Sequence, residues 1–457
     1  MSLDLARQSL DEKAVREARL IAIYLPMHTA TRLAIELLPR LRTQNSNAVL
    51  CCYGLYAPMN AAFLRTFGVA NILGGEFEKG LAELADRLAI QVEYVKDSDH
   101  LATASESSTS LERLTFEVPD RAGLPPLAQY ASLVMPGGAV RVVGSTEASR
   151  GCKHLCRHCP IVPVYNGVFR IVQRDVVLED IRRQVAAGAQ HISFGDPDFF
   201  NGIGHALQLM EMFHREFPAV TYDATVKIEH LRKHEQYLNT LKMTGCLFII
   251  SAVESVDDAV LTALEKGHTR EDFLHVARKF RELGMILHPT FLPFTPWTTL
   301  EGYLDLLRVI SEEDLTEHVA PIQLGIRLLI PAGSRMLELK DINTMVGSFD
   351  PQSLAYPWKN ADPRVDALSD KIQQLAASAD RKKQTRTQAF ETIWHAAHQA
   401  AGLDSPALPD RGGANGTVPF LSEPWYCCAE PTSAQIISIG GAKPVPRPAD
   451  VSADSFV

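Results

Sequence analysis

The chain has no apolar run that approaches the roughly 20 residues of a membrane-spanning helix, and runs such as residues 247–250 are far shorter. Only 8 of its 457 residues are cysteine, too few for a disulfide scaffold. The formal net charge of −9 leaves no basic footprint for broad nucleic-acid binding. The first twenty residues are charged and lack the apolar centre of a signal peptide. These absences predict a cytoplasmic protein that binds neither membranes nor nucleic acids.

What is present indicates a folded α/β protein. Apolar residues make up 46% and charged residues 22%, which excludes disorder, collagen and coiled coil for the bulk of the chain. Short buried strands alternate with helices over residues 1–96, as in a small parallel α/β domain. A polar, Ser/Thr-rich stretch then begins a predicted linker over residues 97–138.

A longer alternation follows the linker. Residues 139–336 contain six strand–helix units, which favours a partial (β/α)6 barrel over a flat sheet. The predicted strands are 139–144, 190–194, 221–226, 246–252, 286–292 and 322–329. Residues 337–402 are helical in character, and residues 403–457 form an irregular tail rich in Gly, Pro and Ser.

Three cysteines stand directly after the first predicted barrel strand, in the sequence Gly-Cys-Lys-His-Leu-Cys-Arg-His-Cys-Pro. Cys152, Cys156 and Cys159 on one tight loop can hold three irons of a [4Fe–4S] cluster and leave the fourth without a protein ligand. A molecule that offers an amine and a carboxylate, as S-adenosylmethionine does, can chelate that iron. Zinc, with His154 or His158 as a further ligand, and a structural role for the cysteines are the alternatives. Zinc is less favoured because no second Cys-x2-Cys pair is present.

The triad resembles that of radical S-adenosylmethionine (radical SAM) enzymes, and weaker similarities continue through residues 139–335. This resemblance implies a partial barrel with a cluster loop after its first strand. It also implies that Gly195 and Asp196, in Phe-Gly-Asp, receive the methionine amino group, and that Glu254 or Ser255 reaches the ribose. Further cofactor-binding candidates at predicted strand ends are Lys227, Glu229 and Arg327. For Glu229 and Arg327, a surface or fold-stabilising ion pair explains the residue equally well.

The N-terminal region loosely resembles the cobalamin-binding domains attached to many radical SAM enzymes, through residues 55–58 and 74–78. Their Asp-x-His-x-x-Gly signature is incomplete. His28 is present in Pro-Met-His-Thr-Ala-Thr, but the acid and the glycine are missing. Some such domains bind cobalamin without that histidine, so the resemblance leaves cobalamin open. We favour a retained fold without the cofactor.

The tail carries adjacent cysteines, Cys427 and Cys428, in Pro-Trp-Tyr-Cys-Cys-Ala-Glu-Pro. Physically, this pair can bind a soft element such as trivalent arsenic, act as a redox dithiol, contribute to an auxiliary cluster, or be incidental. The ending resembles a group of radical SAM enzymes that end in Cys-Cys-Ala-Glu-Pro or carry selenocysteine at the second cysteine. One member of that group is associated with making arsinothricin, which implies that the pair holds arsenic during catalysis.

The resemblance therefore predicts a radical SAM transferase that moves the 3-amino-3-carboxypropyl group of S-adenosylmethionine onto thiol-bound trivalent arsenic. Its partners would be a small-molecule substrate and an electron donor such as flavodoxin or ferredoxin. Two alternatives stay open. One is a radical SAM enzyme that uses a 5′-deoxyadenosyl radical, with or without cobalamin, to methylate or rearrange a small metabolite. The other is a non-catalytic module that senses metals or metalloids.

Overall fold

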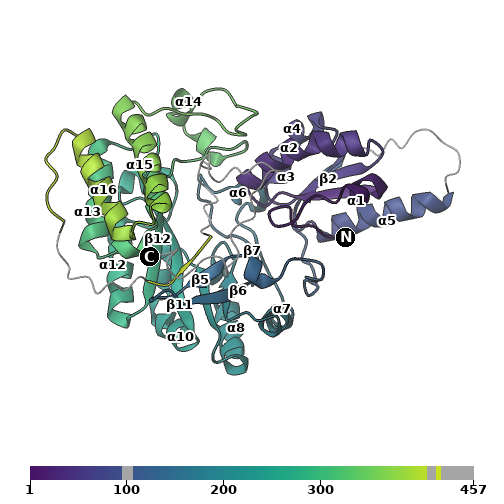
Figure 1. Cartoon of the computed structure of the whole chain (residues 1–457), viewed down its shortest axis with the longest axis horizontal. Coiled ribbons are helices and arrows are strands. Elements are labelled where there is room, and N and C mark those ends of the chain that lie inside the picture. Colours follow the sequence, from purple (N-terminus) through teal and green to yellow (C-terminus); the bar gives the residue numbers. More distant parts are fainter. Residues whose placement is uncertain (95–105, 409–417, 424–457) are drawn as a thin grey trace.

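The computed structural model describes residues 1–94, 106–408 and 418–423, and Figure 1 shows two α/β units side by side. The first unit has a parallel sheet in the order β1-β2-β3-β4. Its strands are β1 (Leu20–Tyr24), β2 (Val49–Tyr53), β3 (Asn71–Gly75) and β4 (Glu106–Ser110). Its helices are α1 (Glu12–Glu17), α2 (His28–Gln44), α3 (Tyr56–Met59), α4 (Ala61–Thr66) and α5 (Glu78–Tyr94).

This unit confirms the predicted alternation, with one addition. The strand β2 is buried on both faces, as expected for a parallel strand between helices. The addition is β4, which pairs in parallel with β3 inside the stretch expected to be a linker. Its sequence, Glu-Ser-Ser-Thr-Ser, lacks the apolar residues that mark a buried strand, because β4 lies at the edge of the sheet.

The second unit is built on a curled half-barrel sheet in the order β12-β11-β10-β9-β6-β5-β13, which confirms the predicted fold class. Its parallel strands are β6 (Val140–Thr146), β9 (His191–Phe194), β10 (Thr221–Thr225), β11 (Cys246–Glu254) and β12 (Ile286–Phe291). The helices that alternate with them are α7 (Arg174–Ala186), α8 (Ile203–Glu216), α9 (Ile228–Lys233), α10 (Leu238–Met243), α11 (Asp258–Ala263), α12 (Arg270–Leu283) and α13 (Leu300–Glu312).

The prediction of a sixth barrel strand over residues 322–329 is wrong in its detail. A 3-10 helix over Pro321–Gly325 takes its place, and only a parallel bridge between Phe294 and Arg327 continues the strand order. The chain packs here against α15 (Pro363–Arg381), where Gln373 Nε2 donates to the Gly325 carbonyl at 3.0 Å. A Cβ at Gly325 would lie 3.0 Å from the Gln373 side chain, so this close approach requires glycine.

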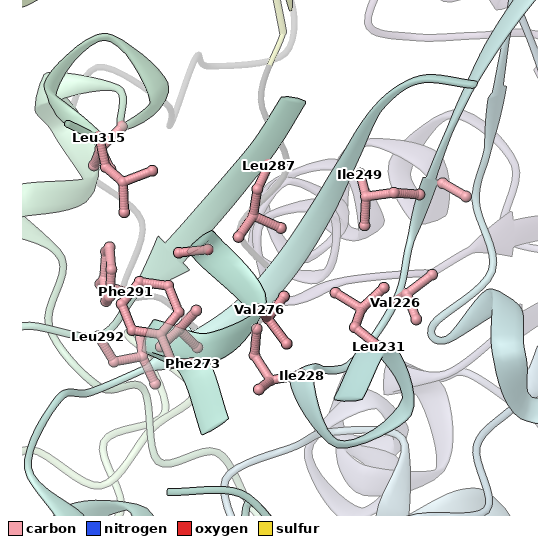
Figure 2. Close-up of a cluster of buried hydrophobic side chains, with 14 of the residues drawn as sticks. Val226, Ile228, Leu231, Ile249, Phe273, Val276, Leu287, Phe291, Leu292 and Leu315 are labelled. Carbon is pink, nitrogen blue, oxygen red and sulfur yellow. The ribbon is translucent and has the colours of Figure 1, made fainter. Parts of the chain in front are cut away.

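The hydrophobic core lies between the barrel sheet and its helices. Figure 2 shows part of it, where side chains of β11 and β12, and Val226 just after β10, meet those of α9 and α12. Leu231 and Ile249 are fully buried there, and Phe273 and Phe291 cross edge to face. A capping box between Thr269 and Asp272 fixes the start of α12. This packing holds the carboxyl ends of the strands in fixed positions.

A short C-terminal stretch joins the two edges of the half-barrel sheet. We call residues 418–423 the closing segment. His288 on β12 lies 2.8 Å from the Pro419 carbonyl through Nε2, and β13 (Phe420–Leu421) pairs antiparallel with β5 (Ser132–Val134). Because β5 is also antiparallel to β6, β13 runs in the same direction as β6. The closing segment therefore heads toward the end of the barrel where the parallel strands terminate.

The remaining elements complete the second unit. A two-stranded ribbon, β7 (Ser149–Gly151) with β8 (Phe169–Ile171), and α6 (Val162–Tyr165) surround the cysteine loop. The predicted helical extension is present as α14 (Ile342–Met345), α15 and α16 (Arg386–Ala400). Within the described ranges, no helix combines the length and apolar character needed to cross a membrane.

Candidate active site

The three loop cysteines lie at the carboxyl end of the barrel, between β7 and α6. Cys152 and Cys156 are 8% and 6% exposed, and the Cys159 N–H donates to the Cys156 carbonyl at 3.1 Å, which makes a tight turn. Burial raises the pKa of Cys152 to about 12, and the neighbouring Cys159 and Cys156 sulfurs add to that effect. Iron would replace the thiol protons that burial retains, so two buried thiols and the half-buried Cys159 on one tight loop fit an iron–sulfur cluster.

Polar side chains from later elements hold this loop. Asn201 accepts from Cys152 Sγ at 3.8 Å, accepts from the Lys153 N–H at 3.3 Å, and donates to the Gly151 carbonyl at 3.3 Å. Lys227, at the start of α9, donates to Cys156 Sγ at 3.7 Å. An ammonium beside one thiolate stabilises negative charge on the cluster sulfurs.

A second group near Cys152 bears on the zinc alternative. Ligand atoms of Cys152, His154 and Asp198 lie within 4.8 Å of one another. Asp198, however, lies 2.6 Å from Nδ1 of His230 and 3.5 Å from Nε2 of His154. Burial raises the pKa of Asp198, but the two imidazoles outweigh it and lower that pKa to about 2. The carboxylate therefore lies against two imidazoles beside the loop, and its Oδ2 accepts no hydrogen bond from the described residues.

Asp196 follows β9, next to the cysteine loop, as predicted. It is 2% exposed, and its carboxylate accepts from the Ala148 N–H at 2.8 Å and from the Ser149 hydroxyl at 2.6 Å. Burial raises its pKa to about 7 despite these bonds. Gly195 keeps the adjacent face open, since an added Cβ would meet only the Thr146 carbonyl at 3.6 Å. Asp196 thus ties the turn after β9 to the chain that leads into Cys152.

A buried charge network lies at the end of β11. Glu254 accepts from Lys266 Nζ at 3.2 Å and lies 3.1 Å from His158 Nε2. All three residues are less than 7% exposed. Burial raises the pKa of Glu254, but Lys266 and His158 lower it to about 2. Because His158 lies between two cluster cysteines, this network couples β11 to the cysteine loop.

One site residue escaped the sequence analysis. His268 is 6% exposed, and neither ring nitrogen makes a hydrogen bond to the described residues. Burial is the main cause that lowers its pKa to about 3, and the ammonium groups of Lys266 and Lys227 add to the effect. The ring is therefore neutral. A buried, unbonded imidazole costs free energy unless a ligand uses its nitrogens. Residues 265–269 resemble part of the family's fourth strand, but the sequence did not single out His268 as a site residue, because its isolation arises only from the fold.

The other predicted site residues have varied surroundings. Glu229 lies 3.3 Å from Lys227 Nζ, near the loop. Ser255 accepts from the Asp257 N–H at 3.0 Å in the turn before α11. Arg327 donates to Asp366 at 2.8 Å and lies 4.0 Å from the Trp358 ring centroid, which matches the fold-stabilising alternative. The tail pair, Cys427 and Cys428, lies outside the described residues.

The remaining described cysteines lie away from the site. Cys51 and Cys52 are fully buried in β2, and burial raises both pKa values to about 12. Cys246 begins β11, so it lies at the opposite end of that strand from Glu254. None of the three can join the loop cysteines without unfolding a strand.

Comparison with known proteins identifies the barrel. Residues 146–308 match the Radical SAM superfamily. A tRNA-2-methylthio-N(6)-dimethylallyladenosine synthase from Aliarcobacter butzleri is 26% identical over 183 residues, and the match spans 37% of this chain and 41% of that protein. The chain therefore spans less than half the length of this curated relative.

Solved structures share the fold over a larger part of the chain. TsrM, a radical SAM methyltransferase from Kitasatospora setae, solved with tryptophan and a SAM analogue, is 14% identical with a TM-score of 0.60, covering 87% of each chain. OxsB, a cobalamin-dependent radical SAM enzyme, is 14% identical with a TM-score of 0.59, covering 83% of this chain and 63% of its own. At these identities the likeness concerns the fold. The superfamily match implies a [4Fe–4S] cluster and S-adenosylmethionine as cofactors.

Cobalamin, which such neighbours bind, fits the described residues poorly. His28 is 4% exposed, and its Nε2 lies 2.6 Å from the Ser353 carbonyl. A Cβ at Gly74 would lie 2.2 Å from Pro58, and one at Gly75 would lie 2.1 Å from the Ser110 carbonyl. These glycines therefore accommodate the chain's own packing and do not form a cofactor cradle. Residues of the barrel unit also contact this edge of the N-terminal sheet, as shown by the hydrogen bond from Tyr165 to Glu76 at 3.2 Å.

Proposed function

We propose that this chain, whose residues 146–308 match the Radical SAM superfamily, is an aminocarboxypropyl transferase that acts on trivalent arsenic. Cys152, Cys156 and Cys159 would hold the cluster, and Gly195 with Asp196 would border the methionine end of S-adenosylmethionine. Further contacts to S-adenosylmethionine would come from Lys227, Glu229, Glu254 and Ser255. Arg327, which pairs with Asp366, would instead stabilise the fold. Cys427 and Cys428 would hold the arsenic during the transfer.

The proposed reaction consumes two electrons, which a donor such as flavodoxin or ferredoxin would supply one at a time. When bound, the cluster supplies the first electron to the sulfonium, and the bond to the methionine γ-carbon breaks to release methylthioadenosine. The γ-carbon forms a bond to arsenic in place of one tail sulfur. The second electron returns that sulfur to a thiolate, so arsenic stays trivalent. In this scheme Lys227 holds the loop sulfur of Cys156, and Asp196 fixes the loop against β9.

The observation that carries the tail assignment is the direction of the closing segment. The Ser422 N–H donates to the Ser132 carbonyl, and Ser132 pairs with Val142 on β6. Thr146 ends β6 four residues later, about 13 Å further along and two strand spacings, about 10 Å, to the side. That diagonal is about 17 Å, and five extended residues after Ser422 span up to about 17 Å. Covalent geometry therefore allows Cys427 to reach the end of β6.

The test is anaerobic reconstitution, then reduction with S-adenosylmethionine, with and without arsenite. Chromatography identifies the nucleoside, and mass spectrometry detects an arsenic–carbon product. Methylthioadenosine together with an aminocarboxypropyl–arsenic product supports the proposal. The double variant Cys427→Ser/Cys428→Ser should keep its cluster and lose the arsenic product. Normal product from that variant would refute the tail assignment, and the absence of product from the wild-type protein would refute the acceptor.

A second candidate is a radical SAM enzyme that forms a 5′-deoxyadenosyl radical and modifies a small metabolite. The likeness of fold to a radical SAM methyltransferase over 87% of both chains favours it. The same chromatogram separates the two candidates, because 5′-deoxyadenosine replaces methylthioadenosine in this case.

A further inference from the structure

A cavity of about 190 Å³ lies between the N-terminal sheet and the cysteine loop. One wall consists of Tyr24, Leu55 and Phe77, at or just after the ends of β1, β2 and β3. The opposite wall includes Ile161 and Tyr165, from the chain just after the cysteine loop. The carboxyl ends of parallel strands are where open α/β sheets bind ligands. The cavity therefore stands at the ligand-binding edge of the first unit.

The same cavity reaches the site in the barrel. Gly195 and Pro197, on either side of Asp196, also line it. A molecule in the cavity would thus contact the turn that borders the methionine end of S-adenosylmethionine. Its volume is below the roughly 300–1,000 Å³ of pockets for drug-sized ligands, so it suits a small molecule better than a corrin.

The charge around the cavity is negative. Arg150 and Glu147 line it, and the guanidinium contacts Glu147 and Glu78 and lies 3.5 Å from Glu76. One cation thus faces three carboxylates, of which Glu147 lines the cavity and Glu76 and Glu78 contact Arg150 without lining it. Glu76 is fully buried, so its pKa is raised even though Arg150 opposes the effect. Oε2 of Glu76 and Oε2 of Glu78 accept no hydrogen bond from the described residues. Carboxylates that outnumber the cation beside them leave an excess of negative charge, which repels anionic ligands.

We infer that this cavity is the acceptor site and that it admits only small acceptors without negative charge. The inference rests on the proposed function, in which the acceptor is trivalent arsenic. Arsenous acid is uncharged at neutral pH, whereas arsenate and phosphate are anions. The carboxylates around Arg150 therefore select trivalent arsenic over its abundant anionic analogues, and the cavity size excludes larger acceptors.

The size of the cavity is tested with Leu55, which follows β2 and lines the cavity from the N-terminal side. Leu55→Trp should fill the cavity and raise the KM for arsenite about tenfold, while the dissociation constant for S-adenosylmethionine stays unchanged. Leu55→Ala enlarges the cavity and should leave both values near wild type. Leu403→Trp, at a position that is 56% exposed, is the matched control. An unchanged KM in a folded Leu55→Trp protein would overturn the inference.

The charge of the cavity is tested with Glu147→Gln, which removes one carboxylate without adding bulk. Phosphate should not inhibit the wild-type protein and should compete with arsenite in this variant. Equal phosphate inhibition of both proteins would overturn the charge argument. Retention of hydroxocobalamin through gel filtration would overturn the size argument. Each result is distinct from a failure of the proposed function, in which the wild-type protein forms no arsenic–carbon product at all.

Discussion

Replacing Glu254 by glutamine removes the carboxylate that pairs with Lys266 and His158 at 3.2 Å and 3.1 Å. Lys266 and His158 lower its pKa from 4.5 to about 2 although burial acts in the opposite direction. At about 1.4 kcal/mol per unit, that shift corresponds to about 3 kcal/mol of stability. This value agrees with the cost of about 3–5 kcal/mol for leaving one buried charge unpaired. We therefore expect Glu254→Gln to lower the free energy of unfolding by about 3 kcal/mol.

The assay is urea unfolding of the reconstituted protein without oxygen, followed by tryptophan fluorescence. In the double variant Glu254→Gln/Lys266→Met neither charge remains, so it should regain at least about 1 kcal/mol relative to the single variant. Glu338→Gln, which breaks an exposed ion pair with Arg335, should leave the midpoint unchanged. If the single and double variants are equally unstable, the loss comes from packing and the charge argument is wrong.

The pH dependence of the same pair gives a further check. A carboxyl whose pKa is lowered by folding stabilises the protein fully above its unfolded pKa and loses that contribution as the pH falls toward the folded value. For Glu254 this window lies between about 4.5 and 2. The stability difference between the wild-type protein and Glu254→Gln should therefore stay constant from about pH 8 to 5.5. A difference that shrinks within that range would contradict the assigned ionisation.

Four further outcomes are expected. Cys152→Ser should not give the EPR signal of a reduced [4Fe–4S] cluster after reconstitution, and an unchanged signal would exclude this ligand. His268→Leu should weaken S-adenosylmethionine binding about tenfold in equilibrium dialysis, because a buried polar partner is lost, whereas His275→Leu, on α12, should not. Lys227→Met removes an ammonium beside a cluster sulfur, so the midpoint potential in an EPR-monitored redox titration should fall; an unchanged potential would argue against the contact. Leu421→Asp places a charge against the apolar interior, so the urea midpoint should fall; an unshifted midpoint would mean that the closing segment does not stabilise the barrel.

The sequence predicted the features that depend on local patterns. Strand–helix alternation predicted both α/β units, and the spacing of Cys152, Cys156 and Cys159 located the cysteine loop. The strands that escaped notice owe their pairing to distant partners. Residues 106–110 and 420–421 have no apolar alternation, and they form strands only because β3 and β5 offer open edges.

The side-chain network of the site was less predictable. Asp196 was expected beside the loop, but its bond to Ser149 depends on how the turn after β9 meets β7. Likewise, His268 stands out only once folding buries it between two lysines and leaves both its nitrogens without partners. Such relations join residues far apart in the sequence, and a single sequence without tertiary contacts does not contain them.

Pairing between β13 and β5 affects how the role of the last residues can be studied. Deleting the chain after residue 402 would remove the tail thiols. It would also leave the backbone of Leu133 and Val134 without the strand that pairs with it. A newly exposed sheet edge invites other molecules to pair with it, so a shortened protein would aggregate for reasons unrelated to chemistry. A cut placed just beyond Glu423 keeps that edge protected, and loss of product would then be attributable to the missing thiols.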